Sequence, residues 1–381
     1  MQIKKILSLI MAVALLTMTA CGGGAPSSSS APAAPAETSA APSSAPESSS
    51  MPEVSSGTVN QQPSCVMPAP PADGKRPELH IGILKGPSAI GMLQLMEYSD
   101  NPELSYTTYN DYTYTMAGSP DQLVGGVVKG EFDMAVLPTN LASTLYSKTE
   151  GKIKLATINT LGVLYLVEAG DSIKSVADLK GRTIYATGKG STPEFVLNYV
   201  LEQNGLKVGT DVKVEYKTEH TELAALMAAG QADIALLPQP FVTTALSQND
   251  KLRVALDMTK EWDTASKGQS GLAMSGIVVQ QKLLEENPAA VEAFMVEYAN
   301  STLYVTEPQN LDAVAEMAVK RGIIPSAAVA KKAIPQCNIV FISGEEMKKI
   351  AGGFLQVLFE GAPQSVGGKL PDEGFYYTTK E

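Results

Sequence analysis

The chain has 381 residues, of which 40 are acidic and 29 are lysine or arginine, so its formal net charge is −11. Because no basic face is visible in such a sequence, we expect no nucleic-acid partner. The two histidines and three cysteines lie far apart in the sequence. This spacing argues against a structural zinc site, and no metal or cofactor is indicated.

The first twenty residues are typical of an export signal. Lys4 and Lys5 precede an apolar run, residues 6–16, that is too short to span a bilayer. The Met-Thr-Ala-Cys that follows resembles the lipobox of bacterial lipoproteins. The resemblance implies that residues 1–20 are removed and that Cys21 receives acyl chains such as palmitate, which would anchor the protein at the outer face of the cytoplasmic membrane. The alternative is an ordinary signal peptide followed by an incidental cysteine.

Residues 21–76 are rich in Ser, Ala and Pro. We expect a disordered tether there, because the segment has little apolar surface to offset the entropy of ordering. From residue 77 onward the chain is long enough for two lobes of about 150 residues each. No apolar run in this part reaches transmembrane length. Cys65 and Cys337 leave two alternatives open, a disulfide or a buried free Cys337.

The first predicted elements follow the tether. In residues 79–84, apolar residues first alternate with other residues and then follow one another directly. This pattern predicts a strand, which the Lys-Gly-Pro-Ser turn at residues 85–88 ends. A helix is expected after this turn. Residues 103–115, rich in Tyr and Thr, predict a further strand. Ser119, followed by Pro and Asp, predicts the start of the next helix.

One unit of sequence occurs twice. Gly130-Glu-Phe-Asp-Met-Ala-Val-Leu-Pro138 recurs in register as Gly230-Gln-Ala-Asp-Ile-Ala-Leu-Leu-Pro238. Each copy indicates the end of a helix, a short buried strand and the start of a new helix. A unit made twice suggests two similar α/β lobes with a cleft between them. Asp133 and Asp233 occupy equivalent positions, and we expect them to make structural contacts at the strand starts rather than to act in catalysis.

The second lobe also begins with a strand and a Gly-rich turn. Ser191 or Thr192 is positioned to cap the helix of residues 194–204, with Pro193 at its first position. Trp262 is expected in a polar loop. Further strands are predicted, in chain order, at residues 153–157, 161–168, 183–186, 212–216, 252–256 and 272–280. After Pro288 the pattern is helical to the end of the chain.

The chemistry of the loops favours binding over catalysis. His80 and His220 are the only histidines, and no Gly-x-Ser-x-Gly motif is present. Loops between strand ends and helix starts offer unsatisfied N–H groups and hydroxyls to a small polar or anionic ligand. Arginine is absent from these turns, so a guanidinium clamp is not indicated. The candidate ligand-binding residues are Gly86, Pro87, Ser88, Thr139, Asn140, Gly190, Ser191, Thr192, His220, Thr221 and Gln239.

Several segments, in this order and spacing, carry a family resemblance. They are Gly86-Pro-Ser-Ala89, Gly130-Glu-Phe-Asp133, Leu137-Pro-Thr-Asn140, Ser175-Val-Ala-Asp-Leu-Lys-Gly181, Gly188-Lys-Gly-Ser-Thr-Pro193, Gly230-Gln-Ala-Asp233 and Leu237-Pro-Gln-Pro-Phe241. The sequence resembles the substrate-binding proteins of ABC transporters, in the class that includes nitrate, sulfonate, taurine and thiamine-precursor binders.

This resemblance implies an α/β, two-lobed periplasmic-binding-protein-like fold (type II), with two crossover strands between the lobes and the ligand in the cleft. We expect lobe 1 to contain residues 77–166 plus 272–381, and lobe 2 to contain residues 167–271. The crossovers are expected near residues 165–168 and 270–278. The implied partners are an ABC permease and its ATPase. The resemblance also implies that the protein is a monomeric receptor and not an enzyme, and that its two lobes close on the ligand by a hinge.

Two other functions are compatible with the same fold. One is an enzyme of cofactor biosynthesis, such as a thiamine-precursor synthase or a lyase, which would need a catalytic His or Cys cluster in the cleft. The other is a surface lipoprotein that senses a ligand and signals to a partner.

Overall fold

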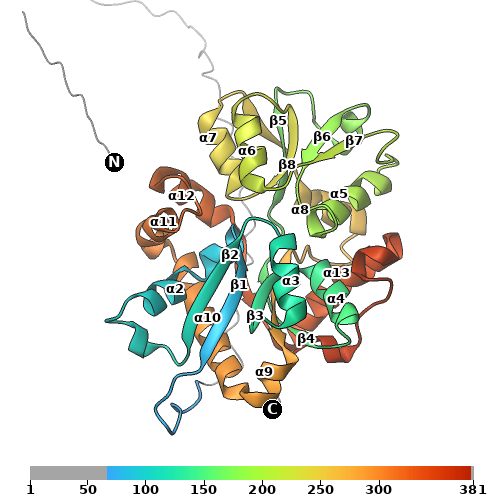
Figure 1. Cartoon of the computed structure of the whole chain (residues 1–381). Coiled ribbons are helices and arrows are strands. Elements are labelled where there is room, and N and C mark those ends of the chain that lie inside the picture. Colours follow the sequence, from blue (N-terminus) through green and yellow to red (C-terminus); the bar gives the residue numbers. More distant parts are fainter. Residues whose placement is uncertain (1–66, 379–381) are drawn as a thin grey trace, which may run out of the picture. The chain divides into compact units, whose positions relative to one another are not determined.

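The computed structural model describes residues 67–378 (Figure 1). The expected signal peptide, Cys21, Cys65 and most of the expected tether lie outside these residues. Arg76, the last residue of the expected tether, is already attached to the fold. Its guanidinium donates to the carbonyl of Asn110 at 2.5 Å and pairs with Asp111 at 2.7 Å.

Six strands form the first sheet (Figure 1). In spatial order they are β11 (Ile339–Ile342), β4 (Ile153–Thr160), β10 (Ser275–Gln280), β3 (Met134–Pro138), β1 (Glu78–Leu84) and β2 (Asp111–Ala117). β1 is parallel to β2 and β3. β10 runs antiparallel to both β3 and β4, and β11 runs antiparallel to β4.

Five strands form the second sheet. In spatial order they are β7 (Lys213–Tyr216), β6 (Thr183–Ala186), β8 (Ile234–Pro238), β5 (Leu164–Ala169) and β9 (Leu252–Asp257). β6 is parallel to β7 and β8, whereas β5 is antiparallel to β8 and β9. The chain therefore leaves the first sheet at residues 161–163 and returns to it through residues 258–274. The expected lobe boundary after residue 166 falls within β5.

Helices pack on both sheets. Among them, α10 contacts β11, α13 contacts β4, and α6 contacts β8. The helices are α1 (Pro87–Gly91), α2 (Leu93–Asp100), α3 (Asp121–Lys129), α4 (Thr139–Lys148), α5 (Thr192–Gln203), α6 (His220–Ala228), α7 (Phe241–Gln248), α8 (Met258–Ser266), α9 (Gln281–Glu286), α10 (Pro288–Thr306), α11 (Leu311–Lys320), α12 (Ala327–Ala333) and α13 (Gly344–Gly361).

The repeated unit forms equivalent elements in the two sheets. Its copies become β3 and β8, and every residue of both strands is buried. Gly130 and Gly230 follow α3 and α6 with φ of 73° and 67°, a left-handed conformation that favours glycine at a helix end. The Asp133 carboxylate accepts a hydrogen bond from the backbone N–H of His80 at 2.8 Å. Asp133 therefore makes the structural contact that the sequence predicted.

Three expected elements were wrong. Trp262 lies in α8, not in a loop, and it is buried because it packs against Tyr199 and Phe354 at ring-centroid distances of 4.9 and 5.2 Å. Residues 339–342 form an edge strand, although the pattern after Pro288 had predicted helices alone. The strand predicted to start at residue 103 begins only at Asp111. Each error concerns a short segment whose conformation depends on tertiary partners.

One continuous core joins the two sheets. It includes Leu137 of β3 in the first sheet, Val163 between the sheets, Leu236 of β8 in the second sheet and Trp262 of α8. Cys337 is a fully buried free thiol in a separate core cluster, and its Sγ lies 3.3 Å from the carbonyl oxygen of Ala333. Within the described residues Cys337 is therefore a buried free thiol, while Cys65, the other cysteine of the disulfide alternative, lies outside them.

Candidate ligand-binding site

A cavity of about 90 Å³ lies at the carboxyl ends of strands from both sheets. The segments after β1, β2, β4 and β6 reach it, as do the last residues of β3 and β8. Ligands of open α/β sheets bind at this edge. The cavity is lined by Leu84, Lys85, Gly86, Pro87, Ser88, Gly118, Ser119, Pro120, Pro138, Thr160, Val163, Leu164, Thr187, Gly188, Ser191, Pro193, Thr218, His220, Pro238, Phe241, Met274 and Ser275.

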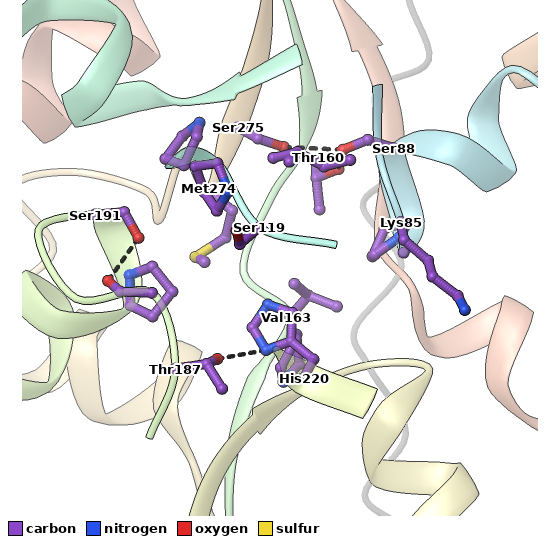
Figure 2. Close-up of a pocket in the computed structure, with 18 of the residues that line it drawn as sticks. Lys85, Ser88, Ser119, Thr160, Val163, Thr187, Ser191, His220, Met274 and Ser275 are labelled. Atoms are coloured by element: carbon purple, nitrogen blue, oxygen red, sulfur yellow. Dashed lines mark hydrogen bonds between the residues drawn. The ribbon is translucent and has the colours of Figure 1, made fainter. Parts of the chain in front are cut away.

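Three hydroxyl groups meet on the wall that the first sheet provides (Figure 2). We call Ser88, Thr160 and Ser275 the hydroxyl cluster. Ser88 Oγ lies 3.3 Å from Ser275 Oγ and 3.5 Å from Thr160 Oγ1. Behind the cluster, Ser275 Oγ donates to Oδ1 of the fully buried Asn159 at 2.8 Å. The cluster is therefore fixed from behind. Ser275 uses its one hydroxyl hydrogen on Asn159 and can only accept from a ligand, whereas the hydroxyls of Ser88 and Thr160 can donate or accept.

The turn after β1 brings Ser88 to the cavity. Gly86 has φ of 141°, which only glycine adopts without strain. Pro87 occupies the first position of α1, where the missing N–H costs no helical hydrogen bond. The sharp turn and the immediate helix start place Ser88 opposite Thr160, with 5% of its surface exposed.

His220 lies on the wall that the second sheet provides (Figure 2). Its Nδ1 is 2.5 Å from Thr187 Oγ1, and its ring centroid is 5.1 Å from that of Phe241. Removal from water lowers the pKa of His220 to about 4. The imidazole is therefore neutral at neutral pH, with one nitrogen that donates and one that accepts.

The structure brings five of the predicted site residues together around this cavity. They are Gly86, Pro87, Ser88, Ser191 and His220. Ser191 Oγ donates to the carbonyl of Gly188 at 2.6 Å, so part of its hydrogen-bonding capacity is used within its own turn.

Asn140 and Thr192 lie outside the cavity lining and face each other. Asn140 is 1% exposed and Thr192 is fully buried. Thr192 Oγ1 donates to Asn140 Oδ1 at 3.0 Å, and Asn140 Nδ2 donates to the carbonyl of Ser365 at 2.9 Å. This pair joins α4, which follows the first sheet's β3, to α5, which follows the second sheet's β6. Its contacts are structural ones.

Four other predicted residues also lie outside this cavity. Thr139 is fully buried. Gln239 is fully buried as well, and its Oε1 accepts from Thr243 Oγ1 at 2.8 Å. Gly190 lines a neighbouring cavity of about 310 Å³, and Thr221 lines another of about 320 Å³. Thr139 and Gln239 are therefore buried in the protein interior, whereas Gly190 and Thr221 face adjacent cavities.

We expect Asn140→Ala to lower the free energy of unfolding by about 2–3 kcal/mol, because it removes two buried hydrogen bonds and leaves the Thr192 hydroxyl unpartnered. Urea unfolding followed by circular dichroism measures the loss. Thr192→Val removes only the shared bond and should cost about 1 kcal/mol. The double variant should lose less than the sum of the two single losses; full additivity would contradict the coupling.

Sequence reasoning missed several lining residues, notably Thr160, Met274 and Ser275. Thr160 ends β4, so the rule about carboxyl ends of strands would have identified it. Ser275 begins β10, which runs antiparallel to its neighbours, so its amino end meets their carboxyl ends. Strand direction within a sheet is not visible in the sequence, and Ser275 therefore carried no signal.

Within residues 67–378, no helix is both long and apolar enough to cross a bilayer. In the same part of the chain, no three His, Cys, Asp or Glu side chains gather in a way that could hold a metal ion.

A family model described as "ABC transporter, phosphonate, periplasmic substrate-binding protein" matches residues 114–327, more than half of the chain. Curated relatives in Brucella abortus, described only as binding proteins, are 26% identical over 174 residues. That alignment covers 45% of this chain and 52% of theirs, so the chain spans about half the length of the curated relatives it matches.

Solved structures share the fold. An ABC transporter protein from Parabacteroides distasonis is 28% identical, with a TM-score of 0.62 over 79% of this chain and 99% of its own. The alkanesulfonate-binding protein of Xanthomonas axonopodis, solved with MOPS bound, is 18% identical, with a TM-score of 0.60 over 80% of this chain and 96% of its own. The expected two-sheet, type II periplasmic-binding-protein-like fold is confirmed.

Proposed function

Because the chain belongs to the phosphonate family of periplasmic substrate-binding proteins of ABC transporters, we propose that it captures a small sulfonate- or phosphonate-type oxyanion in the cavity between its sheets. Substrate-binding proteins of ABC importers bind small molecules for transport. We further propose that the ligand of this chain is a nutrient, and that the chain delivers it to one particular permease and its ATPase.

The proposal is supported by the set of hydroxyl side chains in the cavity wall, which is otherwise mostly apolar. Serine and threonine hydroxyls project into it from both sheets, and no acidic side chain is among the described residues that line it. Hydroxyl donors suit the oxygens of a sulfonate or phosphonate. The apolar side chains of Val163, Met274 and Phe241 offer contacts for an organic substituent.

The mode of attachment is part of the same proposal. Acylation of Cys21 would hold the domain at the outer face of the cytoplasmic membrane, and residues 21–76 would let it reach a permease. We propose that the receptor acts as a monomer, that residues 161–163 and 258–274 serve as the hinge, and that it catalyses no reaction. Labelling with a radioactive fatty acid, with Cys21→Ser as the control, tests the anchor.

Ligand-dependent thermal unfolding tests the binding function. At a concentration 100 times its Kd, a bound oxyanion stabilises the folded state by about 2.7 kcal/mol. We therefore expect methanesulfonate, ethanesulfonate or methylphosphonate to raise the unfolding temperature by several degrees, with sodium chloride of equal ionic strength as the control. The proposal is abandoned if none of these compounds changes the transition and isothermal titration calorimetry detects no binding.

A further inference from the structure

Positive charge is scarce around the cavity. Lys85 is the only residue with a charged side chain at neutral pH among the described residues that line it. Figure 2 shows the Lys85 side chain extending away from the hydroxyl cluster. Lys85 also lines the neighbouring cavity of about 320 Å³ beside α7 and the α11–α12 turn. Its ammonium is therefore directed away from the place where the hydroxyls converge.

Two lysines beside an adjacent cavity are held by aromatic rings. Lys189 and Lys217 line the adjacent cavity of about 310 Å³. Lys189 Nζ lies 5.8 Å from the centroid of Tyr216, and Lys217 Nζ lies 5.4 Å from the centroid of Tyr185. Such cation–π contacts stabilise an ammonium at the ring face. Neither lysine lines the cavity that holds the hydroxyl cluster.

One carboxylate approaches the cavity from outside its lining. A Cβ added to Gly118, which lines the cavity, would lie 2.6 Å from the Glu219 carboxylate, so that carboxylate packs directly against the wall. The Glu219 carboxylate opposes the entry of negative charge, and each additional charge on the ligand increases the opposition. Asp121 lines the adjacent cavity together with Lys189 and Lys217, so the charges there are of both signs.

We propose that the cavity selects oxyanions with a single negative charge and accepts a phosphonate only as its monoanion. This inference rests on the proposed function. Hydroxyl and imidazole dipoles can replace the hydration of one charge, but the cost of removing an ion from water rises with the square of its charge. Arg or Lys commonly faces the second charge of a dianion in phosphate sites, and among the described lining residues no cation faces the hydroxyl cluster.

Methylphosphonate provides the test because its second ionisation falls near neutral pH, whereas methanesulfonate keeps one charge throughout. Calorimetric titrations of both probes are made at about pH 5.5 and about pH 8.5; His220, with a pKa of about 4, is neutral at both values. We expect methylphosphonate to bind at least about tenfold more tightly at the lower pH, while methanesulfonate changes by less than about threefold.

Two variants identify the source of any counter-charge. Lys85→Met should leave the ratio of the methylphosphonate affinities at the two pH values within about threefold of that of the unmodified protein, because its ammonium points away from the cluster. Met274→Lys places a cation in the lining and should remove the preference for the monoanion.

Each outcome has a distinct meaning. Equal or tighter binding of methylphosphonate at the higher pH overturns the inference and leaves the proposed function intact. A larger change of the affinity ratio in Lys85→Met also overturns it, because Lys85 would then supply the counter-charge. Failure of both probes to bind at either pH removes the proposed function itself.

Discussion

Met274→Trp should weaken the binding of methanesulfonate by about 100-fold or more, equivalent to about 2.7 kcal/mol. The Met274 side chain is among the labelled residues in Figure 2 and lines the cavity of about 90 Å³. Its backbone is fixed on both sides, because its N–H donates to Thr160 at 3.0 Å and its carbonyl accepts from Thr139 at 3.2 Å. The larger indole must therefore occupy the space that a ligand would use.

Met274→Leu is the matched control, because it nearly conserves side-chain volume and should alter the affinity only slightly. Calorimetry measures binding, and the unfolding temperature of each ligand-free variant shows whether the fold is retained. If the folded tryptophan variant bound methanesulfonate as tightly as the unmodified protein, the ligand would have to lie elsewhere.

Trp262→Ala is expected to lower the free energy of unfolding by about 3–5 kcal/mol, the range found for large aromatic residues in cores. Trp262 is 1% exposed and packs between Tyr199 of α5 and Phe354 of α13. Its indole N–H donates to the carbonyl of Ser270 at 3.1 Å. The side chain therefore ties α8 to the segment that returns the chain to the first sheet. Urea unfolding measures the loss.

Trp262→Phe separates packing from hydrogen bonding. It retains an aromatic ring between Tyr199 and Phe354 but loses the donor to Ser270, so we expect a smaller loss of about 1–2 kcal/mol. Equal losses in the two variants would show that the hydrogen bond, not the aromatic packing, dominates. A loss below about 1 kcal/mol in Trp262→Ala would show that the site collapses around the missing side chain.

The candidate site was only partly accessible to sequence reasoning. Ser88, Ser191 and His220 were found because each lies in a polar turn between a strand end and a helix start, and all three line the cavity. Asn140 and Thr192 lie in equally suitable turns but face each other. A capping pattern predicts where a helix begins, but it does not predict which neighbour the first turn meets.

The sequence alone determined the repeated unit that forms β3 and β8, because a Gly stop, a short apolar run and a proline act through local backbone preferences. It also determined the turn that presents Ser88. Tertiary structure decided that Ser275 joins Ser88 and Thr160, since only the antiparallel course of β10 brings its first residue to that edge. It likewise decided the helical state and burial of Trp262, because those depend on partners that are distant in the chain.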